Sequence, residues 1–145
     1  MDFPIVELLS ESASEAWVTG YFHPQGLRCI RCKASVEQAR RFRQTSKSDL
    51  RVYRCKDCKG IYTVYSGTVF EGSHLPCATV VLLIRGVLKG ESAASLAREL
   101  GLSRTTVTKF RYLLHRGLQA QQARSALEDD EVEADECYQN AGEKK

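Results

Sequence analysis

The spacing of apolar residues changes along the chain, and the predicted secondary structure changes with it. Between Ile61 and Phe70 (IYTVYSGTVF), Tyr, Val and Thr alternate in a way that predicts a β-strand closing a small sheet. After this segment, apolar residues recur at roughly helical intervals up to the helix breaker Gly90. A helix is therefore predicted there, with Pro76 in its first turn.

A second helical pattern occupies residues 92–114 (SAASLARELGLSRTTVTKFRYLL). It predicts two helices joined by a tight turn at Gly101, the second of them capped by Ser103. The apolar positions expected to face inward are Leu96, Ala97, Leu100, Leu102, Val107, Phe110 and Leu114. This arrangement is typical of a helix-turn-helix, and a plain helical hairpin within another α domain is the alternative.

The outward face of the second helix combines short hydroxyl side chains with long cationic ones. Such side chains can reach phosphates and base edges in the major groove of DNA. The candidate DNA-binding residues are Arg104, Thr105, Thr106, Thr108, Lys109 and Arg111.

The net charge of +3 over 145 residues hides an uneven distribution. Residues 28–127 carry 19 Lys and Arg against six Asp and Glu, a net charge of +13. Residues 1–27 contain four acids and no Lys or Arg, and residues 128–145 contain eight acids and two Lys. The basic middle indicates a surface that meets a polyanion, although a solvated basic face has the same composition.

Hydropathy gives no sign of a membrane segment. The longest apolar run, residues 78–84, is far shorter than the ~20 residues that cross a bilayer. The acidic N-terminus also lacks the basic start of a signal peptide. We therefore expect a cytoplasmic protein without a membrane partner.

Four of the six cysteines form two CxxC pairs, Cys29 and Cys32 (CIRC) and Cys55 and Cys58 (CKDC), separated by 22 residues. In a reducing compartment this spacing is typical of a zinc ribbon, in which four thiolates complete a tetrahedral structural site. Redox dithiols and chance pairs are the alternatives. A polar turn at 46–49 is expected to separate strands near 35–44 and 50–54.

Basic residues crowd these pairs, and they can serve either to lower thiol pKa values or to contact phosphates. They are Arg28, Arg31, Lys33, Arg54, Lys56 and Lys59. The two remaining cysteines, Cys77 and Cys137, have no such spacing and are expected to be free thiols.

The order of these parts resembles that of bacterial insertion-sequence transposases of the ISXO type. The resemblance is carried by residues 12–17 (SASEAW), 54–76 (RCKDCKGIYTVYSGTVFEGSHLP) and 132–144 (VEADECYQNAGEK). Ile30 and Lys33 depart from the family pattern, which has Pro and Gly at these positions of the first cysteine turn.

The resemblance implies an α+β fold of four parts. These are an N-terminal helix (1–24), a four-cysteine zinc ribbon (25–72), a helix-turn-helix domain (73–120), and a linker with the first strand of a DDE catalytic domain (121–145). A lone first strand has no partner strands, so this last part is expected to behave as a disordered acidic tail.

The resemblance also matches Asp135 to the first metal-binding aspartate of the DDE domain. The complete family enzyme uses Mg²⁺ held by at least three acidic ligands, and one aspartate cannot replace them. We therefore expect this chain to be no enzyme, but the DNA-binding part of a truncated transposase, acting on double-stranded DNA at the terminal inverted repeats of the element. A homo-oligomer or a complementing catalytic fragment are further expected partners, and the expected location is the nucleoid.

Two other functions are compatible with the same residues. One is a self-standing transcriptional regulator built from the ribbon and the helix-turn-helix. The other is a ribbon that binds RNA or protein, with the helix pair serving only for packing.

Overall fold

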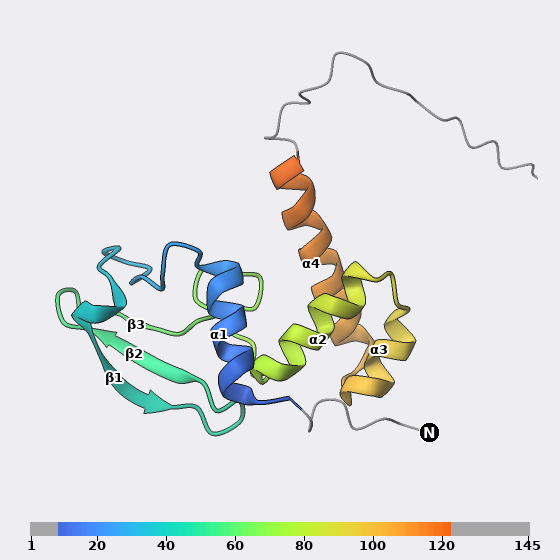
Figure 1. Cartoon of the computed structure of the whole chain (residues 1–145), viewed down its shortest axis with the longest axis horizontal. Coiled ribbons are helices and arrows are strands. Elements are labelled where there is room, and N and C mark those ends of the chain that lie inside the picture. Colours follow the sequence, from blue (N-terminus) through green and yellow to red (C-terminus); the bar gives the residue numbers. More distant parts are fainter. Residues whose placement is uncertain (1–8, 123–145) are drawn as a thin grey trace, which may run out of the picture.

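The computed structural model describes residues 9–122, which form four α-helices and one three-stranded antiparallel sheet. In Figure 1 the sheet lies on one side, helices α2 to α4 on the other, and α1 between them. The elements are α1 (Glu11–Phe22), η1 (Val36–Gln38), β1 (Ala39–Gln44), β2 (Arg51–Cys55), β3 (Ile61–Tyr62), α2 (Cys77–Leu88), α3 (Ala93–Leu100) and α4 (Arg104–Gln122). The predicted mixture of helices and a small sheet is confirmed.

The first two predicted strands are present, with β1 shorter than expected. The sequence from Ser35 begins with the 3₁₀ turn η1, so β1 starts only at Ala39. A polar turn then leads to β2, where the Thr45 and Ser48 hydroxyls lie 2.7 Å apart and the Leu50 N–H donates to Thr45 Oγ1. The sheet order is β1-β2-β3, which leaves β1 at one edge.

The predicted strand at 61–70 is wrong beyond its first two residues. Only Ile61 and Tyr62 pair with β2, and the chain then runs through successive turns. Hydroxyl groups satisfy the backbone locally: Ser66 Oγ accepts from the Thr63 N–H at 2.9 Å, and Thr68 Oγ1 donates to the Tyr65 carbonyl at 2.8 Å. Ser and Thr offer the backbone such alternatives to a sheet ladder, and Gly67 adopts a φ of 75° that ends any extended run.

Helix α2 begins at Cys77, later than predicted, because Pro76 is its N-cap rather than part of its first turn. Proline has no side-chain group that could cap the free N–H groups there. The Glu11 carboxylate of α1 takes that role, since both of its oxygens lie 3.2 Å from the Ala78 N–H. An acid at the positive end of a helix is also favourable electrostatically.

The two helices predicted around Gly101 are present as α3 and α4. Gly101 ends α3 in the left-handed conformation with φ 63°, and the Leu102 N–H donates to the Ala97 carbonyl at 2.9 Å. Ser103 Oγ accepts from the Thr106 N–H at 3.1 Å, which confirms the predicted cap of α4. All the predicted inward positions are buried, except that Leu102 is half-buried against the same core.

Two separate hydrophobic cores support these elements. The larger core joins α1, the turns after β3 and the helices α2 to α4 around the fully buried Phe70. Its ring contacts Phe22 edge-on at 5.9 Å between centroids and stacks on Phe110 at 4.8 Å. The smaller core lies in the sheet and consists of Leu27, Cys29, Cys55 and Tyr62, with half-buried neighbours. No helix in the described part of the chain is long and apolar enough to cross a bilayer.

The contact between α2 and α3 predicts the effect of one substitution. A Cβ atom at Gly86 would overlap the buried side chain of Leu96, so Gly86→Ala should lower the free energy of unfolding by about 1–3 kcal/mol. Gly117→Ala is the matched control, because Gly117 lies within α4 with no heavy atom near its added Cβ. This control should be neutral or stabilising by up to ~1 kcal/mol. Urea unfolding measures both, and equal stability of the two variants would contradict the packing.

Candidate functional site

Two tight turns of the same shape present the four cysteines. In the first, the Cys29 carbonyl accepts from the Lys33 N–H at 2.9 Å, and the Cys29 N–H donates to the Ala34 carbonyl at 2.9 Å. In the second, the Cys55 N–H donates to the Gly60 carbonyl at 2.9 Å. Lys33 and Lys59, each directly after the second cysteine of its pair, have φ of 63° and 60°. Glycine would adopt this left-handed backbone without strain. Having lysine instead of glycine at position 33 therefore costs about 1–2 kcal/mol.

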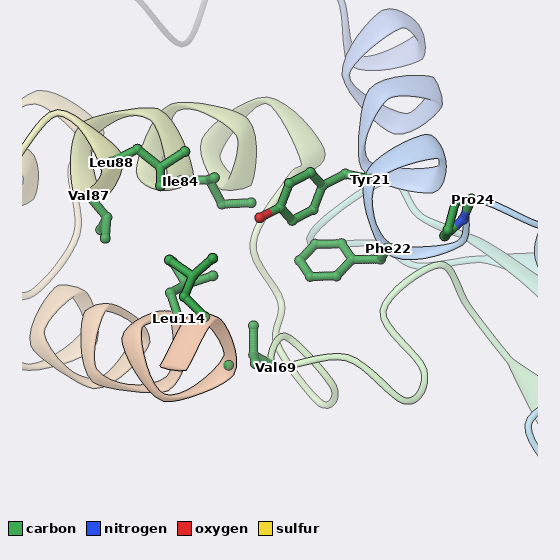
Figure 2. A pocket seen from close by; sticks show the side chains of 10 residues that line it. Tyr21, Phe22, Pro24, Val69, Ile84, Val87, Leu88 and Leu114 are labelled. Carbon is green, nitrogen blue, oxygen red and sulfur yellow. The ribbon is translucent and has the colours of Figure 1, made fainter. Parts of the chain in front are cut away.

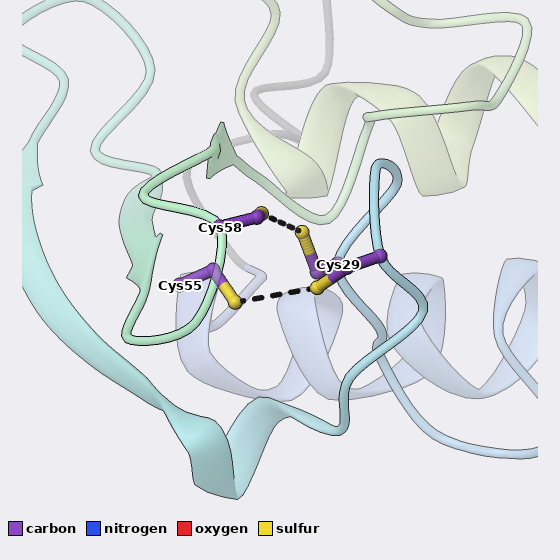
Figure 3. A group of neighbouring side chains, drawn as sticks. Cys29, Cys55 and Cys58 are labelled. Carbon is purple, nitrogen blue, oxygen red and sulfur yellow. Dashed lines mark hydrogen bonds between the residues drawn. The ribbon is translucent and has the colours of Figure 1, made fainter.

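The four Sγ atoms of Cys29, Cys32, Cys55 and Cys58 lie within 4.8 Å of one another. Cys29 Sγ is 3.4 Å from Cys58 Sγ, and Cys32 Sγ is 3.5 Å from Cys55 Sγ. Figure 3 shows how side chains from the two turns point toward one another. A tetrahedral site with Zn–S bonds of about 2.3 Å needs sulfur atoms about 3.8 Å apart, so the spacing is compatible with one metal ion. All four cysteines are free of disulfide bonds.

Without a metal ion, hydrogen bonds between the thiols make their pKa values differ. The backbone N–H of Cys32 is the main group that lowers the pKa of the Cys29 thiol, to about 7, against the opposing effect of burial. The Ala34 N–H lowers the pKa of Cys32, but the neighbouring Cys55 thiol and the other thiols outweigh it and raise the pKa to about 12. Without a cation the cluster therefore does not hold four thiolates together at neutral pH.

The predicted DNA-binding residues of α4 fall into two groups. Arg104, Thr105, Thr108 and Lys109 are exposed, as predicted. Thr106 is half-buried, and its hydroxyl lies 2.7 Å from Ser103 Oγ.

Arg111 is also half-buried rather than pointing freely outward. Its guanidinium donates to the backbone carbonyl of Glu91, in the connection between α2 and α3. Arg111 therefore links α4 to the connection before α3 by a hydrogen bond. The sequence pattern could not show this partner, since Glu91 lies on another element.

The four-cysteine cluster and the exposed face of α4 are separate sites. The cluster lies at the sheet, on the opposite side of α1 and α2 from α3 and the start of α4 (Figure 1). The predicted acidic residue Asp135, the whole segment 123–145 and Cys137 lie outside the described residues. The remaining predicted free thiol, Cys77, is buried, and burial raises its pKa to about 11.

An apolar hollow of about 450 Å³ lies between α1, α2 and α4. Figure 2 shows the labelled side chains, including Phe22, Val69, Ile84 and Leu114, directed into this hollow. The Tyr21 hydroxyl is the one polar side-chain group among the residues that line it. The hollow thus offers packing surface and no set of groups for acid–base or metal chemistry.

Comparison with protein-family models, with curated proteins and with solved structures finds no match for this chain.

The differing thiol pKa values predict a pH dependence of metal binding. Cys32 keeps its proton at neutral pH in the metal-free chain, because its pKa is raised to about 12, and the metal must displace it. The apparent dissociation constant for Zn²⁺ should therefore rise as pH falls, by roughly tenfold per pH unit for each displaced proton. Competition with a coloured chelator between about pH 8 and pH 6 measures it. Cys77→Ser should show the same slope, and a pH-independent affinity would contradict the arrangement.

Proposed function

We propose that Cys29, Cys32, Cys55 and Cys58 hold one structural Zn²⁺ ion and that the sheet around them is a zinc ribbon. The support is the closeness of the four Sγ atoms, since four thiolates around one zinc ion leave no coordination position for water or substrate. Zinc also explains how so small a core is stable, because two of its four buried residues are cluster cysteines.

We further propose that α3 and α4 form a helix-turn-helix that binds double-stranded DNA, with α4 in the major groove. The observation that carries this is the division of α4 into two faces. Val107, Phe110 and Leu114 anchor it in the larger core, while Arg104, Thr105, Thr108 and Lys109 stay exposed on its first half. The N-terminal residues of a recognition helix are those that reach base edges, and the positive end of the helix favours phosphate.

The narrower proposal is that the chain recognises the terminal inverted repeats of an insertion sequence, as the DNA-binding part of a transposase. It is supported by the sequence motifs that resemble ISXO-type transposases.

Metal removal tests the zinc proposal. The purified full chain should contain one zinc per chain, and Cys55→Ser should lose it, whereas Cys77→Ser should keep it because Cys77 lies in the other core. Chelation should unfold the sheet and leave most of the helical circular dichroism signal, since α2 to α4 are held by a separate core. Elemental analysis and far-ultraviolet spectra measure this. Zinc retained by Cys55→Ser would contradict the proposed ligand set.

Substitution on α4 tests the DNA proposal. Lys109→Gln should weaken binding to a terminal-repeat duplex by on the order of five- to tenfold and reduce the salt slope of binding by about 1, if Lys109 contacts a phosphate. Lys89→Gln is the control, because it removes the same charge from an exposed position at the end of α2. Fluorescence anisotropy over a series of salt concentrations measures the affinity and the salt slope of both variants. Wild-type affinity in both Lys109→Gln and Arg104→Gln would exclude α4 as the recognition helix.

The same assay separates a transposase from a regulator. Specific affinity for the terminal repeats, compared with a random duplex, supports the transposase proposal. Specific affinity for a promoter outside any mobile element would instead identify a self-standing regulator.

A further inference from the structure

A second basic site lies on the sheet, away from α4. A hollow of about 410 Å³ is lined by Arg40 of β1, Arg54 and Cys55 of β2, and Lys56 and Lys59 of the second cysteine turn. Four of these five residues are cations, and the fifth is a candidate metal ligand.

The strand register places like charges against each other in this hollow. Arg40 of β1 and Arg54 of β2 are direct cross-strand partners. Opposed like charges destabilise a sheet unless an anion lies between or beside them. In the described part of the chain the ion pairs are Glu15 with Arg51 and Glu91 with Arg85, so none of the four cations of the hollow has a carboxylate partner.

Arg54 is held in place but is incompletely satisfied. Its guanidinium carbon lies 5.5 Å from the centroid of the Phe42 ring, which a β-bulge between Arg41 and Arg43 leaves outside the ladder. Its Nε atom is buried and has no hydrogen-bond acceptor among the described residues. A buried donor on a cation without an acceptor is costly.

Neutralising the negative charge of the metal cluster would use only part of the positive charge around it. Four thiolates around a divalent ion carry a formal charge of −2. The first cysteine turn adds the cations of Arg28, Arg31 and Lys33 to the four of the hollow, and the second turn contains one acid, Asp57. The positive charge therefore exceeds what the cluster neutralises.

We propose that this hollow binds a phosphate of the DNA backbone and forms a second contact, independent of α4. The inference rests on the proposed DNA binding and adds a place for the sheet in it. A phosphate contact is independent of base sequence, so the sheet contributes affinity and orientation while α4 reads the bases.

The first test uses inorganic phosphate alone, so that it does not depend on DNA binding. In the zinc-loaded full chain, the side-chain Nε–H resonance of Arg54 should shift saturably as phosphate is added. The double variant Arg40→Gln/Lys56→Gln, altered at two exposed positions of the hollow, should lose this saturation. No shift at Arg54 in the wild-type chain would overturn the site.

The second test measures DNA binding against salt concentration. Arg40→Gln/Lys56→Gln should reduce the slope of log affinity against log salt by about 2, and weaken a specific and a random duplex equally. Lys47→Gln/Lys89→Gln removes the same charge at exposed positions outside the hollow and outside α4, and should leave the slope nearly unchanged. Zinc content is measured for both variants.

The outcomes separate this proposal from the function on which it rests. Equal slopes for the two double variants, with zinc lost only from Arg40→Gln/Lys56→Gln, would mean that the cations serve the metal cluster and would overturn the proposal. Saturable phosphate binding in a chain that binds no DNA would refute the DNA assignment of both sites. Tighter binding of single-stranded RNA than of duplex through Arg40 and Lys56 would likewise overturn the assignment to DNA.

Discussion

The arrangement of the helices depends on the burial of one aromatic ring, that of Phe70. It lies in the turns between the sheet and α2, is fully buried, and contacts Phe22 at the end of α1 and Phe110 in α4. A residue outside any helix thereby joins the first helix to the last. Helix α4 carries the proposed recognition face. The position of α4 therefore depends on the turns at 63–72 as well as on α3.

Helix α1 packs in the larger core and contacts both α2 and the sheet through its acidic side chains. Glu11 caps α2, whose own N-cap residue Pro76 cannot do so, and Glu15 pairs with Arg51 of β2 at 3.7 Å. The surface ion pair adds little stability by itself, whereas the cap satisfies a backbone donor at the start of a largely buried helix. Glu11 and Glu15 thus have structural partners, and the sheet and α4 carry exposed cations.

This distribution suits a protein that meets an extended polyanion at more than one place. The proposed recognition helix packs in the larger core, whereas the basic hollow lies on the sheet beside the smaller core. In the proposed function, the zinc ion stabilises the sheet and so positions the hollow, although it takes no part in chemistry. Binding at both sites would then require that the two halves keep a fixed relative position.

Features that depend on local spacing could be predicted from the amino-acid sequence. The CxxC pairs predicted the four-thiol cluster, and the apolar period predicted α3, α4 and their buried positions, because side chains three or four residues apart share a helix face. The remaining features depend on contacts between separate elements. The alternating pattern at 61–70 could not show that Ser and Thr hydroxyls would form hydrogen bonds there in place of a neighbouring strand. No local pattern could show that Arg111 pairs with Glu91, Glu11 with Ala78 or Arg40 with Arg54. Those contacts join residues distant in sequence, so they exist only once packing has brought the elements together.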